Sequence, residues 1–489
     1  MAQNNKIQLK FIYAERQGEG ERQAAAAAGL TELALRLSRG ITAAAAGAEG
    51  NLLFSPLSVY AALALVAEGA DGGTLAELLA VLGAASRDEL GALVGRLARR
   101  ALADRSGGGG PRVSFACGVW HDVTRTLAPS FRDAAAGSFM AEARAVDFRG
   151  RPGEAVDQIN AWVKKETNEL IDSAIDGALP ADADVVVANA VYFKGKWEVP
   201  FKKSLTITDK FHRLDGAAID ARFMRSFRPR HHIACHDGFK VLRLPYEQGH
   251  RPASPPSLFS MCVFLPDARD GLWDLLDEMA STPGFLQDHL PTKTVRVGKL
   301  RLPRFKLTFS DSIAGVLRGL GLEVTFSDGE ADFSKMVVDD GSGRTLSMSS
   351  LVHKAVIEVN EEGTEAAGYT GGVMCGAGPM RPPPVLVDFV ADHPFAFFII
   401  EEMSGALVFA GHVVDPSSAA GALDDDDDVV DPSSTPPRDF AADFFDLEMD
   451  EHHLGIMGCL RVLCYCCICY YCMSLICVGF RNLVTFLLG

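Results

Sequence analysis

Apolar residues recur along this chain at two spacings, one typical of helices and the other of strands. Leu30, Leu33, Leu37 and Ile41 lie three or four residues apart, which predicts an amphipathic helix over residues 23–46. An almost wholly apolar helix is expected to follow and to reach Val66. Further helical segments are predicted over residues 154–171, 272–279 and 313–320.

Short runs rich in Val, Ile and Phe predict strands, and most of them lie in the second half of the chain. Because helices cluster early and strands late, the pattern predicts an α+β fold with large, mostly antiparallel sheets. The predicted strands span residues 113–119, 185–193, 239–244, 260–265, 293–309, 352–359, 385–390, 396–400 and 407–413.

Composition supports a large core in a reducing compartment. Of the 489 residues, 48% are hydrophobic, which is enough to bury a core without disulfides. Four cysteines (Cys117, Cys235, Cys262 and Cys375) are scattered without paired spacing and are expected to be reduced thiols. The first residues lack the apolar core of a secretory signal peptide, so a cytoplasmic or nucleocytoplasmic location is expected. The formal charge of −16 argues against a nucleic-acid partner.

The character of the sequence changes at both ends of residues 25–416, which are expected to form the folded domain. Residues 1–24 are predicted to be a flexible extension, and residues 417–454, with five consecutive aspartates, an acidic disordered linker. Residues 455–489 form a Cys-rich hydrophobic tail. Its segment 462–480 carries no formal charge and is long enough to span a bilayer, so the tail is either a membrane segment or an artefact of the gene model.

The run from Val359 to Val373 combines properties that rarely occur together. Acidic residues precede a glycine, and from Thr364 onward every second side chain is small. Because strand side chains alternate between two faces, this segment is able to leave water and become an internal strand. The alternative, without any special function, is a flexible loop of small residues. One face would carry only small side chains: Thr364, Ala366, Gly368, Thr370 and Gly372.

Ten ordered motifs together give the chain a family resemblance. From about Thr31 to Pro416 it resembles the serpin family, and within it the plant serpins of the cereal Z type. One such motif would be weak evidence, whereas ten in register over most of the chain are specific. The motifs occupy residues 51–58, 128–131, 146–148, 159–163, 188–197, 241–246, 302–305, 331–334, 361–367 and 389–395.

The resemblance implies a fold and a mechanism. The fold has three mostly antiparallel sheets, eight or nine helices and an exposed reactive-centre loop, here about residues 361–387. A protease attacks this loop and forms an acyl-enzyme, and the loop then inserts into the central sheet and distorts the protease. The implied partner is therefore a target protease of the serine type, or of the cysteine type, rather than a nucleic acid. The resemblance implies no enzyme activity, cofactor or metal, and a membrane partner only through segment 462–480.

The resemblance also assigns roles to individual residues. Ser55, Asn189 and His353 match the shutter, a polar cluster beneath the central sheet that parts to admit the loop. Trp197 matches the tryptophan where the loop first enters, and Arg304 matches the partner of Glu361 in an ion pair that tethers the hinge. By chemistry alone, His353 and Trp197 could equally be satisfied core residues. The hinge itself comprises Glu361, Glu362, Gly363, Thr364, Glu365, Ala366 and Ala367.

Two ways of counting place the reactive bond differently. Fourteen residues on from Gly363 lies Ala377–Gly378, which suits elastase-like enzymes and is the favoured bond. Counting back from Asp388 reaches Arg381, but Pro382 follows it and resists trypsin-like cleavage. The bonds Met380–Arg381 and Arg381–Pro382 stay open, and with them a trypsin-like target beside the favoured elastase- or chymotrypsin-like one.

Glycines in the loop leave a second function open. Gly368, Gly371 and Gly372 interrupt the alanine run that the family prefers, and each carries an entropic cost of about 0.5–1 kcal/mol in a strand. The alternatives are a substrate-only serpin, a non-inhibitory protein for binding or storage, or a degenerate gene product.

Enzyme and metal motifs are weak in this chain. No Gly-x-Ser-x-Gly or His-Glu-x-x-His sequence occurs. His232 and His236 lie four residues apart but lack further ligands at zinc spacing, so no metal site is predicted.

Overall fold

The computed structural model describes residues 29–43, 50–179, 183–248, 258–338, 345–346, 348–362 and 385–417. The chain divides into two compact units, Met1–Ala422 and Leu423–Gly489, and the second lies wholly outside the described residues. The predicted N-terminal extension and the tail from residue 418 therefore stay predictions. None of the helices in the described part is long and apolar enough to cross a membrane.

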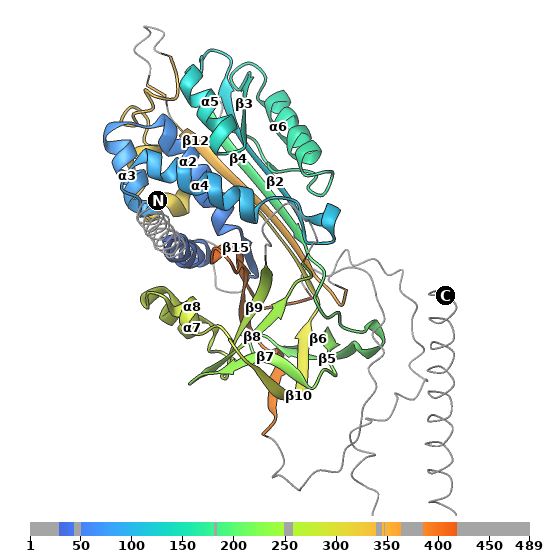
Figure 1. Ribbon diagram of the computed structural model, residues 1–489. Coiled ribbons are helices and arrows are strands. Elements are labelled where there is room, and N and C mark those ends of the chain that lie inside the picture. The colour runs from blue at the N-terminus through green and yellow to red at the C-terminus, as the bar shows by residue number, and fades with distance from the viewer. Residues whose placement is uncertain are drawn as a thin grey trace, which may run out of the picture. The chain divides into compact units, whose positions relative to one another are not determined.

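A five-stranded sheet runs through the larger unit (Figure 1). Its central strands β4 and β12 are parallel and directly paired, from Met348 opposite Val185 to Ile357 opposite Phe193. The strands, in spatial order, are β11 (Phe305–Ser312), β12 (Met348–Val359), β4 (Val185–Lys194), β2 (Arg112–Asp122) and β3 (Ala141–Val146).

Both faces of this sheet are largely buried at its central strands. Val187 and Val191 of β4 point into the larger core, whereas Val186 and Ala190 belong to a second core with Trp162. Helices cover the two faces, with α2 on one side and α6 on the other (Figure 1). A strand buried on both faces has no need of a polar side, which explains why residues 185–193 form an unbroken apolar run around Asn189.

The remaining ten strands form two sheets that share one long strand, β10 (Thr294–Pro303). Residues Thr294–Arg296 pair with β7, whereas its later residues pair with β6 and β13. Three sheets with mainly antiparallel pairing confirm the expected architecture. The other strands are β1 (Leu52–Phe54), β5 (Ile207–His212), β6 (Ala218–Arg225), β7 (Arg230–Cys235), β8 (Phe239–Pro245), β9 (Phe259–Pro266), β13 (Val387–Val390), β14 (Phe395–Glu401) and β15 (Ala406–Val413).

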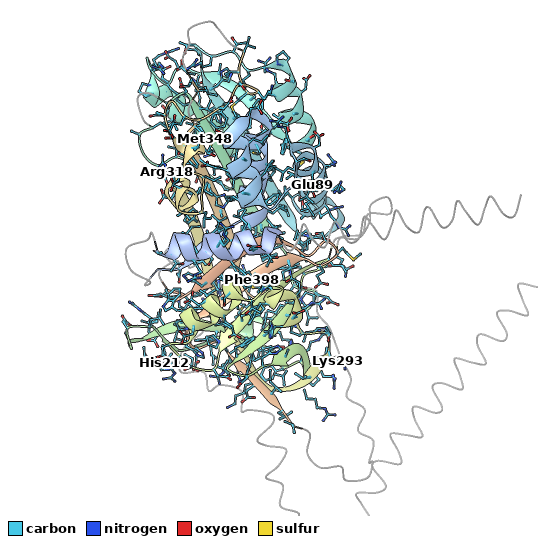
Figure 2. All side chains as sticks on the ribbon, turned by 90° about the vertical axis from the view of Figure 1, so that its left-hand side faces the viewer. Glu89, His212, Lys293, Arg318, Met348 and Phe398 are labelled. Carbon is cyan, nitrogen blue, oxygen red and sulfur yellow. The ribbon has the colours of Figure 1, made fainter. Side chains whose placement is uncertain are left out.

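Most helices lie at one end of the larger unit, where Figure 2 places Glu89 and Arg318, opposite His212 and Lys293; α7 and α8 lie beside β8 and β9 (Figure 1). Helix α2 is buried along nearly its whole length; Ser55 caps its N-terminus and Pro56 occupies its first turn. Within the described residues, the helical segment 29–43 and eight complete helices agree with the eight or nine expected. The complete helices are α2 (Pro56–Gly69), α3 (Gly72–Leu82), α4 (Arg87–Ala101), α5 (Pro129–Ser138), α6 (Pro152–Glu166), α7 (Leu272–Ser281), α8 (Phe285–Asp288) and α9 (Ala314–Gly319), with 3-10 turns at Ser106–Gly108, Lys203–Leu205 and Val324–Phe326.

Two predicted elements have different limits in the structure. The helix predicted over residues 154–171 ends at Glu166, because Asn168 and Glu169 adopt positive φ angles of 52° and 63°. The run 293–309 is two strands rather than one. It breaks at Arg304, whose backbone N–H donates to the Arg222 carbonyl at 2.8 Å as the chain passes from one sheet to another.

We predict that Gly411→Ala destabilises the native fold by at least about 2 kcal/mol, because the new methyl group overpacks the sheet. A Cβ atom at Gly411 would lie 2.2 Å from the Leu52 carbonyl oxygen and 2.8 Å from the Phe397 ring. The matched control is Gly91→Ala within α4, where the nearest atom is an ordinary 3.9 Å away. That variant should be neutral or gain up to about 1 kcal/mol. Urea unfolding of the native form measures both, and equal midpoints for the two variants would contradict the prediction.

Candidate functional site

A buried polar cluster joins the two central strands of the five-stranded sheet. Asn189 on β4 and His353 on β12 are register neighbours, and His353 Nδ1 lies 2.6 Å from Asn189 Oδ1. The other ring nitrogen, Nε2, accepts the backbone N–H of Ser55 at 2.9 Å. Nδ1 therefore carries the proton, and its N–H donates a hydrogen bond to the amide oxygen. This arrangement fixes one neutral tautomer of His353.

Helix α2 completes this shutter cluster from below. Asn189 Nδ2 donates to the Ser58 carbonyl at 3.0 Å, and the Ser55 hydroxyl accepts the Ser58 N–H at 3.3 Å. Ser55, Asn189 and His353 are all fully buried. Burial lowers the pKa of His353 to about 3, so the ring is neutral at physiological pH. The structure thus brings together the three residues that the sequence resemblance assigned to the shutter.

The end of β12 is held by a second set of contacts, here called the hinge anchor. The Trp197 indole Nε1 donates to the Asn360 carbonyl at 2.8 Å, and the Phe201 backbone N–H donates to the Glu361 carbonyl at 2.9 Å. Trp197 is itself fixed by stacking on Tyr246, with ring centroids 4.5 Å apart. The tryptophan is therefore both a packed core residue and a hydrogen-bond donor to the hinge.

Glu361 is the most buried part of the hinge anchor, with 1% of its surface exposed. Its Oε1 accepts the Thr206 hydroxyl at 2.5 Å, and its Oε2 lies 3.4 Å from Arg304 Nε, so the predicted ion pair is present. Glu362 pairs with Lys203 at 2.9 Å closer to the surface. The contributions of Phe201, Thr206 and Lys203 were not predicted from the sequence, because no local pattern marks a residue that meets a segment 155 or more positions away.

Most of the predicted loop lies outside the described residues. These include the hinge residues Gly363, Thr364, Glu365, Ala366 and Ala367 and the candidate reactive-bond residues Ala377, Gly378, Met380, Arg381 and Pro382. On its C-terminal side the chain re-enters as β13, which pairs in parallel with β10, and Asp388 Oδ1 accepts the Lys299 N–H at 2.8 Å. Both ends of the loop are thus joined to strands.

The boundary between β4 and β12 offers a place for an additional strand. β4 and β12 run in the same direction, so a strand entering between them in the opposite direction could form antiparallel ladders with both. The loop starts directly after β12 and would have to turn back to take that place. The shutter cluster and the hinge anchor both lie on this seam between β4 and β12.

A sequence model of the serpins, described as serine protease inhibitors, matches residues 28–416. The chain belongs to the serpin family. A curated rice relative, putative serpin-Z5, is 68% identical over 408 residues, which cover 81% of this chain and 91% of the relative. Rice serpin-Z2A is 48% identical over 419 residues, covering 80% of this chain and 98% of the relative. This chain is thus a plant serpin, and serpin-type protease inhibition is its general activity.

Solved structures agree with the fold. The structure of Arabidopsis AtSerpin1 in its native stressed conformation is similar to this serpin, with a TM-score of 0.74 and 37% sequence identity. The match covers 81% of this chain and 98% of the Arabidopsis chain. The insect serpin-12 of Manduca sexta, at 24% identity and a TM-score of 0.66, supports the fold alone.

The other candidate chemistry of this serpin is ordinary packing. Within the described ranges, no group of three or more His, Cys, Asp or Glu side chains could hold a metal ion. His236 stacks on Phe239, and its Nε2 lies 3.1 Å from the His289 carbonyl oxygen. Cys117 and Cys262 are free and buried, as expected for structural thiols, whereas the free Cys235 is exposed; Cys375 lies outside the described residues.

We predict that His353 makes native stability depend on pH. The unfolded histidine takes up a proton near pH 6.5, whereas the folded one resists protonation down to a pKa of about 3. Stability is therefore full above pH 6.5 and falls by about 1.4 kcal/mol per pH unit as the pH drops from there towards 3. His353→Gln should remove this part of the slope, which urea midpoints at pH 7.5, 6 and 5 will measure.

His231 and His412 contribute to the same slope in the wild type. Burial also lowers the pKa values of these two histidines, to about 4, so their part of the slope should remain in His353→Gln. An unchanged slope in His353→Gln would contradict the assignment.

Proposed function

We propose that this plant serpin is a suicide substrate that traps a protease by acylation followed by insertion of its loop between β4 and β12. The observation that carries the proposal is the direct parallel pairing of these two strands. The loop begins just after the end of β12. An inserted strand would exchange one ladder for two, and each net backbone hydrogen bond contributes about 0.5–1.5 kcal/mol. Loop insertion would therefore lower the free energy of the cleaved molecule.

The length and pattern of the loop support the same event. Residues 363–377 number fifteen, enough to lie alongside the twelve residues of β12. The neighbouring strands are buried on both faces, so an inserted strand needs small side chains on the face that meets the larger core. The small residues at 364, 366, 368, 370 and 372 meet that need.

For the target we propose a serine protease of elastase-like or chymotrypsin-like specificity that cleaves Ala377–Gly378. Trypsin-like cleavage at Arg381–Pro382 or attack at Met380–Arg381 is the competing assignment, and a cysteine protease is the competing class. Incubation with elastase-, chymotrypsin-, trypsin- and papain-like enzymes, followed by mass spectrometry of the released C-terminal peptide, identifies the bond. A peptide that begins at Gly378 supports the proposal, and one that begins at Arg381 or Pro382 overturns the bond assignment.

A non-inhibitory role in binding or storage is the second candidate, favoured by the loop glycines Gly368, Gly371 and Gly372. The two functions differ in what happens after the loop is cut. Insertion should raise the thermal unfolding temperature of the cleaved protein well above that of the intact one, whereas a loop that stays outside should leave it unchanged.

We predict that Thr364→Arg abolishes trapping, whereas Glu365→Arg leaves it largely intact. On the proposed inserted strand, position 364 points into the larger core, where an unpaired charge is costly to bury. Position 365 lies on the opposite face, where Lys194 and Glu358 at the hinge end of the neighbouring strands are only half-buried. The protease should cut both variants, but only Glu365→Arg should give an SDS-stable complex with it. Because both variants introduce arginine, a difference between them reports the effect of burying the side chain and not the effect of its charge alone. Equal trapping by both variants would contradict insertion in this register.

A further inference from the structure

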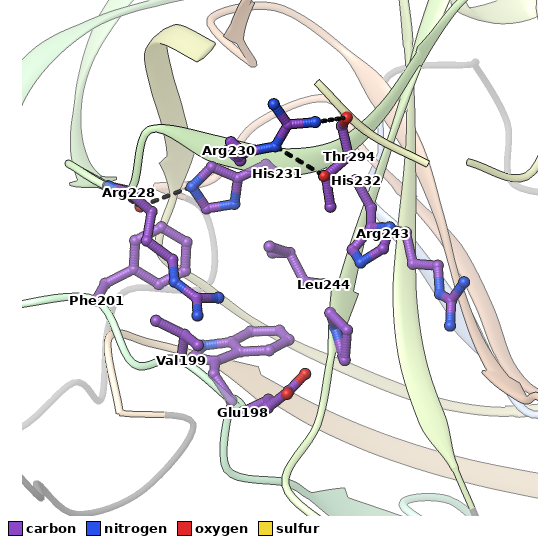
Figure 3. Close-up of a pocket in the computed structure, with 13 residues that line it drawn as sticks. Glu198, Val199, Phe201, Arg228, Arg230, His231, His232, Arg243, Leu244 and Thr294 are labelled. Carbon is purple, nitrogen blue, oxygen red and sulfur yellow. Dashed lines mark hydrogen bonds between the residues drawn. The ribbon is translucent and has the colours of Figure 1, made fainter. Parts of the chain in front are cut away.

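A cavity of about 290 Å³ lies beside the hinge anchor, between the segment that carries Trp197 and strands β7, β8 and β10. Part of its wall is apolar, formed by Val199, Phe201 and Leu244 (Figure 3). Most of the other lining residues are polar, and three of them are arginines. Its size is close to the lower limit for sites that bind small organic ligands.

Three arginines line this cavity, but only one is available to a ligand. Arg230 donates to the side chain and carbonyl of Thr294 at 3.0 and 2.7 Å, and Arg243 donates to Glu402 at 2.8 Å. Figure 3 shows both guanidinium groups turned away from the middle of the cavity, whereas that of Arg228 points into it. Arg228 is an exposed residue, and no salt bridge joins it to a carboxylate within the described part of the chain. Arg228 thus supplies a positive charge to a partly apolar cavity in a protein of net charge −16.

Two histidines add hydrogen-bonding capacity without adding charge. Desolvation, helped by the nearby Arg228 and His232, lowers the pKa of His231 to about 4, and its Nε2 lies 2.8 Å from the Ser226 hydroxyl. Desolvation first, and then Arg243, also lowers the pKa of His232. His232 Nδ1 is buried and has no hydrogen-bond partner within the described part of the chain. A neutral ring nitrogen without a partner can donate to an acceptor atom that enters the cavity.

We propose that this cavity binds a small organic anion, a carboxylate on an apolar ring, and that the bound anion holds the hinge closed. The carboxylate would meet Arg228 and His232, and the ring would pack on Val199, Phe201 and Leu244. Glu198 also lines the cavity and lies at the lower edge of the view in Figure 3. Its carboxylate opposes anion binding, so the proposal requires Arg228 to outweigh it.

The link to the hinge is direct, because the same segment forms the cavity wall and the hinge anchor. Trp197 and Phe201 line the cavity and also hold the carbonyls of Asn360 and Glu361. A ligand that binds only when residues 197–201 are in place opposes any movement that displaces them. This second part rests on the proposed function, since it concerns loop insertion; the binding itself does not.

Calorimetry on the full-length protein tests the binding with naphthalene-2-carboxylate and its neutral analogue naphthalene-2-carboxamide. We expect only the carboxylate to bind, with Arg228→Gln weakening it about tenfold or more, as for loss of a charge-assisted contact. Glu198→Gln should tighten binding, because it removes the opposing charge. The control Arg296→Gln makes the same charge change on β10 at an exposed site outside the cavity and should leave the affinity within about twofold.

Equal binding of carboxylate and carboxamide, or equal losses in Arg228→Gln and Arg296→Gln, would overturn the anion site. Circular dichroism of each variant shows whether a loss reflects unfolding instead. The coupling is tested separately with a protease that the wild type traps. Saturating carboxylate should increase the number of serpin molecules consumed per protease inactivated, and should not do so in Arg228→Gln. An unchanged ratio overturns the coupling, whereas a serpin that traps no protease overturns the proposed function and leaves the calorimetry interpretable.

Discussion

The pairing of β4 with β12 is the constraint on which the rest of this structure depends. Two parallel strands, buried on both faces, meet without an intervening strand, and one polar pair, Asn189 and His353, sits within an apolar ladder. Such a pair costs free energy unless every donor and acceptor is satisfied. Ser55 and Ser58 at the start of α2 supply the missing partners. The sheet is therefore closed in one register, because a slip by one residue would turn Asn189 to the opposite face.

The same arrangement makes the seam separable. Separating a wholly apolar pair of strands would cost the free energy of all the apolar area that they bury. A hydrogen bond between neutral side chains contributes only about 1 kcal/mol net, and its groups can find new partners. Polar groups on the seam can pair with an entering backbone. The hinge anchor follows the same logic: Glu361 is held by an uncharged hydroxyl and one arginine rather than by apolar packing. Specific polar contacts thus hold β4 and β12 together, and in the proposed mechanism the same contacts could be exchanged when the strands separate.

Strands with continuous apolar runs were predictable from the sequence, and their partners were not. Residues 185–193 and 352–359 read as strands because burial on both faces removes any polar side. Strands β5 and β7 were missed, since each has only one buried residue, Phe211 or Ile233, among polar and partly exposed ones. Nothing near Asn189 points to His353, which lies 164 positions away; only the family resemblance connected them. Thr206 could not be predicted at all, because its role depends on where the chain after β12 arrives.

The balance between insertion and escape can be argued from magnitudes. Gly368, Gly371 and Gly372 together would cost the proposed inserted strand about 1.5–3 kcal/mol in lost chain entropy. Even eight net hydrogen bonds formed with β4 and β12 would return roughly 4–12 kcal/mol. The glycines therefore do not decide whether insertion is favourable. In the proposed mechanism they would act on the rate of insertion, where about 1.4 kcal/mol in the barrier is a factor of ten. In the proposed mechanism, hydrolysis of the acyl-enzyme competes with insertion, so the glycines would set how much of this serpin is consumed as substrate for each protease trapped.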